Sequence, residues 1–398
     1  MIDEKNDELK IKQTKEINEQ KQIVQKPSII NNNPTEIEVD RESLKKKDKM
    51  EEYLKKYYPN FFANFELLEY IESGSTGIVY KGKTTNAWNK QLYSFKFCIH
   101  SGDKKNNKAK YHEIVNQKGL HHINICQILA FYKINDKDFF SVSELGKFGD
   151  IDNFLHKFMR RRYLSESFVN YLAKPILEAL FYMHKRKLFH MDIKKGNIVL
   201  DSEMELKIID FSSSFSYQGY APDHELKFGR IGTGRYMAPE ILNKASISMK
   251  EAQKIDIYSF GITIYYLAFG CYPYGLSEIK GGEYDKIVEK LNNAKFEIPK
   301  DFEISKKFEN FLKNVVEIDY KKRYNIEQAL EDPWIKGWDI IAEEKENTGI
   351  QENFIIRLIS DNIPKFNEYM KWYFEAKNFF YLSIYFEIIQ FSCFFILL

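Results

Sequence analysis

The sequence predicts an α+β fold of two lobes, in which a small β-rich lobe with one main helix precedes a larger α-helical lobe. From Phe61 the chain carries short runs of β-branched and aromatic residues separated by glycine and polar turns, which is the pattern of strands. From Ile151 the pattern changes to long apolar repeats with the period of a helix. A β-rich half followed by an α-rich half is typical of two packed units with a cleft between them.

Composition and charge narrow the classes of function. The chain has 398 residues, enough for one large domain or two to three modest ones with a sizeable core. Its 59 basic and 57 acidic side chains give a net charge of +2, which argues against a dedicated nucleic-acid binder. The cysteines are far apart and form no C-x-x-C pair, which excludes a disulfide framework and a zinc finger. This usage fits a reducing compartment, and residues 1–16 contain no apolar run of a secretory signal, so we expect a cytoplasmic location.

The N-terminal segment is polar and charged. Residues 1–52 contain no aromatic side chain, and residues 1–50 carry 11 basic and 11 acidic side chains. Few large apolar groups are therefore available to offset the entropy of ordering the chain. We expect a disordered tail over residues 1–52.

The β-rich half contains five expected strands. Three lie between Phe65 and Ile99, with a glycine turn before Ile78 and a hairpin loop over Asn86–Asn89. A polar loop, Ser101–Lys110, leads to a helix over Lys110–Leu120. The remaining strands and the main helices of the second half are expected at Ile125–Ile134, Phe139–Ser143, Phe168–His184, Asp256–Phe269 and Phe308–Val316.

The C-terminal residues form two further segments. Residues 339–378 contain an amphipathic stretch, expected to be a helical extension. Residues 379–398 are apolar at 16 of 20 positions, long enough to span a bilayer as a helix. Glu387 near the centre opposes this, and with Ser383 and Gln390 it forms a polar stripe on one helix face. Two interpretations stay open: a membrane tether, or a helix packed on the rest of the chain or on a partner.

Two features of the β-rich half suggest a phosphate site. The run Glu72-Ser73-Gly74-Ser75-Thr76-Gly77-Ile78-Val79 lies between two expected strands, where glycines let backbone N–H groups approach phosphates. Lys96 lies in mid-strand, where a lysine needs a partner to be buried, and Glu113 in the following helix is a candidate partner. Each feature alone is more often an ordinary turn or a surface charge.

Three later motifs decide the interpretation. The run His190-Met191-Asp192-Ile193-Lys194-Lys195-Gly196-Asn197 is followed by Asp210-Phe211-Ser212 and then by Ala238-Pro239-Glu240. Their order and spacing resemble a eukaryotic protein kinase of the Ser/Thr type over about 65–338. The resemblance implies a bilobal protein-kinase-like fold with ATP in the cleft, a kinase domain over 61–338, an N-lobe over about 61–143, a hinge over 144–149 and a C-lobe over 150–338. The catalytic loop also resembles that of the Wee family, but Wee kinases lack the Ala-Pro-Glu pattern, so we assign no subfamily.

The resemblance implies roles for matching residues. Asp192 and Lys194 would be catalytic, the first accepting the proton of the substrate hydroxyl and the second neutralising the transferring phosphate. Asn197 and Asp210 would hold Mg²⁺, because phosphoryl transfer depends on positioning and on stabilising negative charge. The residues that would contact or position ATP are Glu72, Gly74, Gly77, Val79, Ser94, Lys96, Glu113, Glu144, Gly146 and Val199.

The same resemblance implies an enzyme class. Lys194, two residues after Asp192, and Gly232-Thr233 before the Ala-Pro-Glu motif imply a protein serine/threonine kinase acting on protein substrates. The oligomeric state cannot be predicted.

Several positions depart from the family pattern. Glu72 replaces the first loop glycine, which we expect to weaken ATP binding, and Met191 replaces an arginine that would receive an activating phosphate. Ser212 replaces a glycine, and we expect a costly positive φ there. The other departures are Ser94, Gln117 and a small residue, Ser143, at the gatekeeper position. They leave an alternative open: a pseudokinase that acts as a scaffold or nucleotide-binding module.

Overall fold

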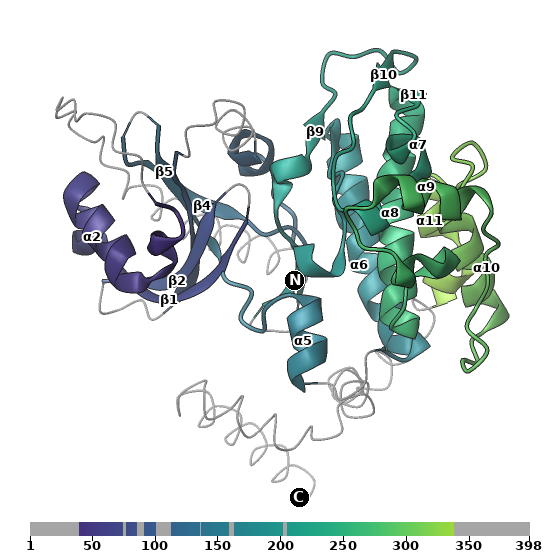
Figure 1. The fold of residues 1–398 in the computed structure, drawn as a ribbon, viewed down its shortest axis with the longest axis horizontal. Coiled ribbons are helices and arrows are strands. Elements are labelled where there is room, and N and C mark those ends of the chain that lie inside the picture. Colours follow the sequence, from purple (N-terminus) through teal and green to yellow (C-terminus); the bar gives the residue numbers. More distant parts are fainter. Residues whose placement is uncertain are drawn as a thin grey trace, which may run out of the picture. The chain divides into compact units, whose positions relative to one another are not determined.

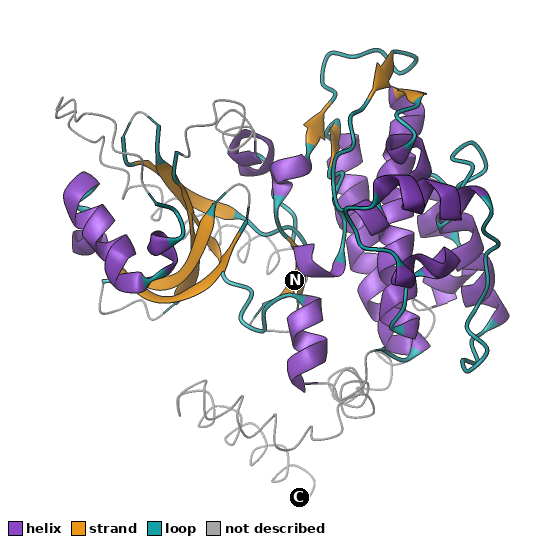
Figure 2. Cartoon of the chain, viewed as in Figure 1, coloured by secondary structure: helices purple, strands orange, loops and turns teal. Residues whose placement is uncertain are grey.

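The computed structural model describes residues 40–74, 77–85, 91–100, 113–135, 137–158, 163–201 and 205–337. A lobe with a five-stranded antiparallel sheet is followed along the chain by a mainly helical lobe, so the predicted bilobal α+β fold is confirmed (Figures 1 and 2). The predicted segments 339–378 and 379–398 lie outside the described residues. Within the described part of the chain, no helix is both long and apolar enough to cross a bilayer.

The sheet has the strand order β1-β2-β3-β5-β4. Its strands are β1 (Phe65–Ser73), β2 (Ile78–Thr84), β3 (Leu92–Cys98), β4 (Ile128–Lys133) and β5 (Phe139–Glu144). All five predicted strands are therefore confirmed. Residues 113–118 are helical, in agreement with the predicted helix over 110–120, whose first residues lie outside the described range. The predicted loops over 86–89 and 101–110 also lie outside it.

The prediction of a disordered tail over 1–52 is wrong for residues 40–52. This segment forms η2 (Ser43–Lys45) and most of α2 (Lys47–Tyr57), and α3 (Phe61–Asn64) follows. Leu44, Met50 and Leu54 are at most 3% exposed because they pack against the sheet. The lack of aromatic residues was misleading, since the apolar side chains of a short helix and of the turn before it are enough to bind the segment to an existing apolar surface. Residues 1–39 lie outside the described range.

The second lobe is built around two long helices, α6 (Glu166–Lys185) and α8 (Met249–Phe269). The predicted helices over 168–184, 256–269 and 308–316 are confirmed by α6, α8 and a helix over Lys306–Val315. The remaining helices are α5 (Ile151–Phe158), α7 (Pro239–Leu242), α9 (Tyr284–Asn292), α10 (Lys306–Val315) and α11 (Ile326–Glu331), with the short 3-10 turns η3 (Lys195–Asn197), η4 (Phe211–Ser213), η5 (Gly234–Tyr236) and η6 (Pro273–Glu278).

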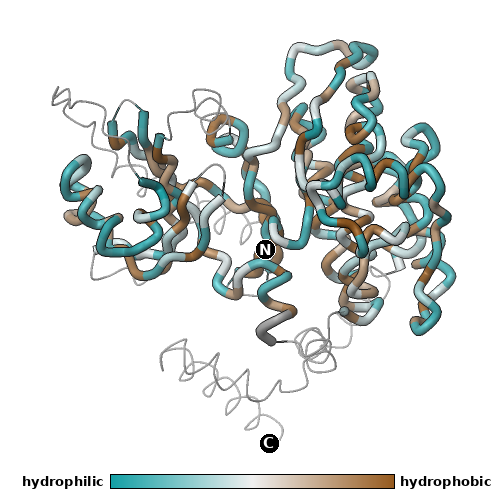
Figure 3. The backbone as a smooth tube through the Cα atoms, in the orientation of Figure 1, coloured by the Kyte–Doolittle hydropathy of each residue, from teal (hydrophilic) through white to brown (hydrophobic). Residues whose placement is uncertain are grey.

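Helix α8 forms the centre of the C-terminal core. Its residues from Ile255 to Tyr265 are all buried, as expected for a helix enclosed by other elements. Gly261 allows α10 to approach closely, because a Cβ there would lie 2.7 Å from Cγ1 of Val316. The hydropathy colouring in Figure 3 shows that hydrophobic and hydrophilic stretches alternate along the chain in both lobes.

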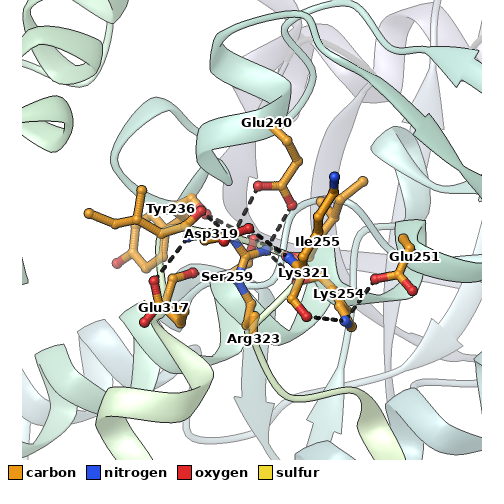
Figure 4. A network of polar contacts seen from close by, with 11 residues as sticks. Tyr236, Glu240, Glu251, Lys254, Ile255, Ser259, Glu317, Asp319, Lys321 and Arg323 are labelled. Atoms are coloured by element: carbon orange, nitrogen blue, oxygen red, sulfur yellow. Dashed lines mark hydrogen bonds and ion pairs between the residues drawn. The ribbon is translucent and has the colours of Figure 1, made fainter.

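A buried ion pair joins α7 to the turn before α11 (Figure 4). Arg323 donates from Nη1 and Nη2 to the two carboxylate oxygens of Glu240, at 2.7 and 3.0 Å. Arg323 also donates to backbone carbonyls of Lys254 and Glu317, at 2.9 and 2.7 Å. Because nearly all donors of this guanidinium are used, the pair fixes α7 relative to α8 and to the turn before α11.

Three short antiparallel strand pairs support the loops between α6 and α8. Two of the pairs join strands that lie far apart in the chain, and the third joins strands that a short turn connects. They are β6 (Leu188–Phe189) with β9 (Phe215–Ser216), β7 (Ile198–Leu200) with β8 (Leu206–Ile208), and β10 (Glu225–Lys227) with β11 (Ser246–Ser248).

Candidate active site

A buried carboxylate on α8 holds the loop that carries Asp192 in place. Asp256 is 0% exposed and accepts hydrogen bonds from the backbone N–H groups of His190 and Met191, at 2.9 and 2.7 Å. Its Oδ2 also lies 2.8 Å from Nε2 of His184. Burial alone would raise the pKa of Asp256, but the hydrogen bond and charge of His184 hold it below its ordinary value. This carboxylate therefore stays ionised and fixes the loop, including Met191 at φ +69°.

Asp192 and Lys194 are brought together as the sequence predicts. Nζ of Lys194 lies 2.7 Å from Oδ2 of Asp192 and 2.7 Å from Oγ1 of Thr233. Nδ2 of Asn197 donates to the backbone oxygen of Asp192 at 2.8 Å and to its Oδ2 at 3.2 Å. Oδ1 of Asp192 is buried and has no hydrogen-bond partner among the described residues. A buried carboxylate oxygen without a donor is costly, so this atom is suited to receive a hydroxyl from a bound molecule.

Lys96 is held between two carboxylates across the sheet-helix junction. Its Nζ lies 2.5 Å from Oε1 of Glu113 and 3.5 Å from Oδ1 of Asp210. Burial alone would lower the pKa of Lys96, but Glu113 and Asp210 raise it above its ordinary value. The predicted pairing of Lys96 with Glu113 is therefore confirmed, and the ammonium is fully charged where phosphates are expected.

The glycine loop between β1 and β2 is shaped by Gly77. A Cβ at this position would lie 2.9 Å from the carbonyl oxygen of Phe97 and 3.1 Å from Cγ of Lys96, so only glycine fits. Val79 pairs with Lys96 across the sheet and lies on the same face of it. The side chain of Glu72 is exposed, but partial desolvation and the carboxylates of Asp150 and Asp210 raise its pKa. The loop therefore contributes a negative group close to the expected magnesium and phosphate region.

The expected hinge lies against strand β7. A Cβ at Gly146 would lie 2.5 Å from Cβ of Val199, so the backbone touches this side chain directly. Ser94 and Ser143 are directly paired between β3 and β5. The carbonyl oxygen of Glu144, expected to bind the adenine edge, accepts a weak hydrogen bond from the thiol of Cys126 at 3.6 Å and keeps a second lone pair.

The residues expected to hold Mg²⁺ fit an oxygen-donor site. Burial alone would raise the pKa of Asp210, but Lys96 holds it below its ordinary value, so the carboxylate is ionised. Asn197 uses its amide nitrogen to bond Asp192, which leaves its amide oxygen available. Among the described residues, no three His, Cys, Asp or Glu side chains gather into a metal site. Mg²⁺ is usually held by one or two side chains together with substrate phosphates and water.

One departure from the family pattern behaves differently from expectation. The costly positive φ expected at Ser212 is wrong: Ser212 lies in η4, and the left-handed residue is Asp210, at φ +60°. Asp210 tolerates this conformation because its side chain accepts from the backbone N–H of Ser212 at 3.4 Å. Sequence reasoning also missed Asn116, whose Nδ2 donates to Oγ of Ser214 at 2.9 Å and so links the helix of Glu113 to η4. No local pattern marks such a long-range contact.

Comparison with known families gives a consistent result. The family model described as "Protein kinase domain" matches residues 65–335. Calcium-dependent protein kinase 4 of Plasmodium berghei is 28% identical over 298 residues, covering 73% of this chain and 52% of that protein. Serine/threonine-protein kinase cds1 of Schizosaccharomyces pombe is 27% identical over 280 residues, covering 68% and 58%. Cell cycle serine/threonine-protein kinase CDC5/MSD2 of Saccharomyces cerevisiae is 28% identical over 233 residues, covering 58% and 31%. The chain thus spans about half the length of the first two relatives.

Proposed function

The chain belongs to the protein kinase family, and from this premise we propose that it transfers the γ-phosphate of Mg·ATP to serine and threonine hydroxyls of protein substrates. The observation that carries the proposal is the pair of Asp192 and Lys194 with Oδ1 of Asp192 left without a partner among the described residues. A substrate hydroxyl that donates to Oδ1 would be oriented for attack, with its proton accepted by the carboxylate.

The remaining residues would position the nucleotide. Lys96, held by Glu113, would neutralise phosphate oxygens, and Val79 and Val199 would enclose the adenine. Asp210 and Asn197 would hold Mg²⁺, which supplies positive charge to the phosphates when bound. Lys194 would stabilise the charge of the transferring group, because its ammonium is already fixed by Asp192 and Thr233.

The class of hydroxyl is part of the proposal. Two relatives carry "serine/threonine-protein kinase" in their names, at 27% and 28% identity. The bond from Lys194 to Thr233 supports the same class, since it joins the segment before the Ala-Pro-Glu motif to the catalytic loop. We further propose a cytoplasmic location, which the wide spacing of the cysteines along the chain supports.

One observation favours an alternative, a nucleotide-binding scaffold with weak or no transfer. Glu72 brings a carboxylate to a part of the cleft that already holds Asp150 and Asp210. Such a group repels nucleotide phosphates and would reduce ATP affinity.

Radiolabelled γ-phosphate transfer from Mg·ATP to a basic protein, with phosphoamino-acid analysis, separates the two functions. We expect the full chain to label serine and threonine, and Asp192→Asn to lose at least about 100-fold of the rate because the hydroxyl loses its acceptor. Lys195→Ala is the matched control on the same loop, since Lys195 pairs with Asp152 instead. A folded chain that binds Mg·ATP but transfers no more phosphate than Asp192→Asn would establish the alternative.

A further inference from the structure

Residues 40–64 cover the outer face of the sheet, although the family match begins only at residue 65. Alternate residues of β1, β2, β3 and β5 carry large aromatic rings on this face, each at most 8% exposed: Phe65, Tyr80, Phe95, Phe97 and Phe140. The ring of Phe61 in α3 lies 5.4 to 6.0 Å from four of them. Without the segment these rings would form an apolar patch on the surface of the domain. The segment is therefore a fixed part of the folded domain.

Directed hydrogen bonds secure the segment along its length. The hydroxyl of Tyr53 donates to Oδ2 of the buried Asp138 at 2.6 Å. The hydroxyl of Tyr80, in β2, donates to the carbonyl oxygen of Leu44 at 2.8 Å. The backbone N–H of Thr85 donates to the carbonyl oxygen of Asn64 at 2.9 Å. Bonds of this kind fix the position of the segment and do not merely exclude water from the sheet.

The first residues of this segment reach the glycine loop. Nη2 of Arg41 donates to the carbonyl oxygen of Gly74 at 3.3 Å. Leu44, three residues later, is 3% exposed and bonded to Tyr80, so the base of the arginine is held in place. On the loop side, the N–H of Gly74 donates to the carbonyl oxygen of Gly77 at 3.0 Å. Both backbone groups of Gly74 are thus engaged.

We propose that Arg41 is a positioning residue for the nucleotide, acting through the Gly74 carbonyl; this inference rests on the nucleotide-binding function proposed above. The carbonyl bond to Arg41 and the N–H bond to Gly77 together fix the backbone of Gly74 at the start of the glycine loop, where glycines are expected to let the backbone approach phosphate oxygens. A guanidinium is suited to this role because it stays charged and offers several donors. Glu72 occupies the position of the first loop glycine, so the loop benefits from a contact outside it that fixes its backbone, and Arg41 supplies that contact.

The test uses the full chain with Arg41→Ala, Arg41→Lys and the control Lys49→Ala, whose lysine pairs with Glu52 on the surface of α2. Three quantities are measured: the affinity for a fluorescent ATP analogue with Mg²⁺, amide hydrogen exchange of the peptide containing Gly74, and the melting temperature. We expect Arg41→Ala to weaken binding about three- to tenfold and to speed exchange at Gly74, as loss of one charge-assisted bond should. Arg41→Lys should recover part of both effects, and Lys49→Ala should match the wild type.

The outcomes separate positioning from simple structural support. Unchanged affinity and unchanged exchange at Gly74 in Arg41→Ala would overturn the proposal. A fall in melting temperature accompanied by faster exchange across the whole sheet would also overturn it, because the arginine would then only stabilise the fold. The exchange measurement needs neither phosphate transfer nor bound nucleotide, so its result is independent of whether the kinase activity itself is found.

Discussion

The side-chain amide of Gln117 donates to the backbone oxygen of Cys126 at 2.7 Å, in the buried space between the helix over 113–118 and strand β4. Gln117 is 7% exposed at a position where the family usually has an apolar residue. A buried polar group is costly only when it lacks a partner, and here both the amide and the carbonyl are satisfied. The departure at Gln117 is thus compensated locally, and it ties the helix of Glu113 to the sheet.

Gln117→Ala should lower both stability and activity. It removes a buried side chain and leaves the Cys126 carbonyl without this donor, at a cost of about 2–4 kcal/mol. Because Glu113 lies one helical turn earlier, we also expect the KM for ATP to rise several-fold. Urea unfolding and steady-state kinetics measure the two effects. Lys118→Ala, an exposed neighbour, is the control and should change neither; equal values for both variants would contradict the role assigned to Gln117.

Gly232→Ala should reduce the rate of phosphate transfer by about 100-fold or more with a smaller effect on stability. Gly232 has φ +96°, and a Cβ there would lie 2.5 Å from the carbonyl oxygen of Met191 and 3.3 Å from Oδ1 of Asp192. The strain, about 1–3 kcal/mol, falls directly on the loop of Asp192. Gly229→Ala is the matched control, because nothing lies within 4 Å of its added Cβ. Wild-type kcat in Gly232→Ala would show that the loop can shift without harm.

The sequence was sufficient to predict the order of the lobes, the strands and the pairs of site residues whose spacing follows the family pattern. Lys96 and Glu113, or Asp192 and Lys194, could be placed because the family spacing carries that information. The local sequence pattern of residues 40–64 could not show that they cover the sheet, since the apolar face that requires a cover belongs to the strands. Phe95 and Phe97 alternate with Ser94 and Lys96, so one face of β3 faces the cleft and the other needs an apolar cover.

Long-range contacts by single polar residues were equally out of reach. Arg41 and Asn116 act through backbone or side-chain atoms 33 and 98 residues away. Neither has a periodic pattern or a motif that would distinguish it from a surface residue. The Ser212 prediction failed for a related reason: backbone φ depends on hydrogen bonds around Asp210, which residue identity alone does not specify.

Glu72→Gln should strengthen Mg·ATP binding in a pH-dependent way. Partial desolvation and the carboxylates of Asp150 and Asp210 raise the pKa of Glu72, so the carboxyl keeps its proton to a higher pH in the folded protein than in the unfolded chain. Below its ordinary pKa the wild-type residue is neutral and resembles glutamine. As pH rises through the raised pKa the carboxylate forms, which destabilises the fold slightly and repels phosphate. The affinity ratio of Glu72→Gln to wild type should therefore be near one at pH values below the ordinary pKa and grow to several-fold once the pH has risen through the raised pKa. Calorimetric titration at several pH values measures it, and a ratio independent of pH would contradict the assignment.

Tyr217 holds the segment after Asp210 in place without a phosphate. Its ring stacks on Phe189 with centroids 4.3 Å apart, and its hydroxyl donates to the carbonyl oxygen of His184 at 2.9 Å. Met191 offers no charge to a phosphate, so we expect phosphatase treatment to leave activity unchanged. Tyr217→Ala should lower kcat about tenfold or more because β9 loses its support beside the catalytic loop. Tyr220→Ala, whose ring is 42% exposed, is the control. A phosphorylated residue within 212–231 that raised the transfer rate many-fold would contradict this account, since the segment would then need a charge that Tyr217 cannot replace.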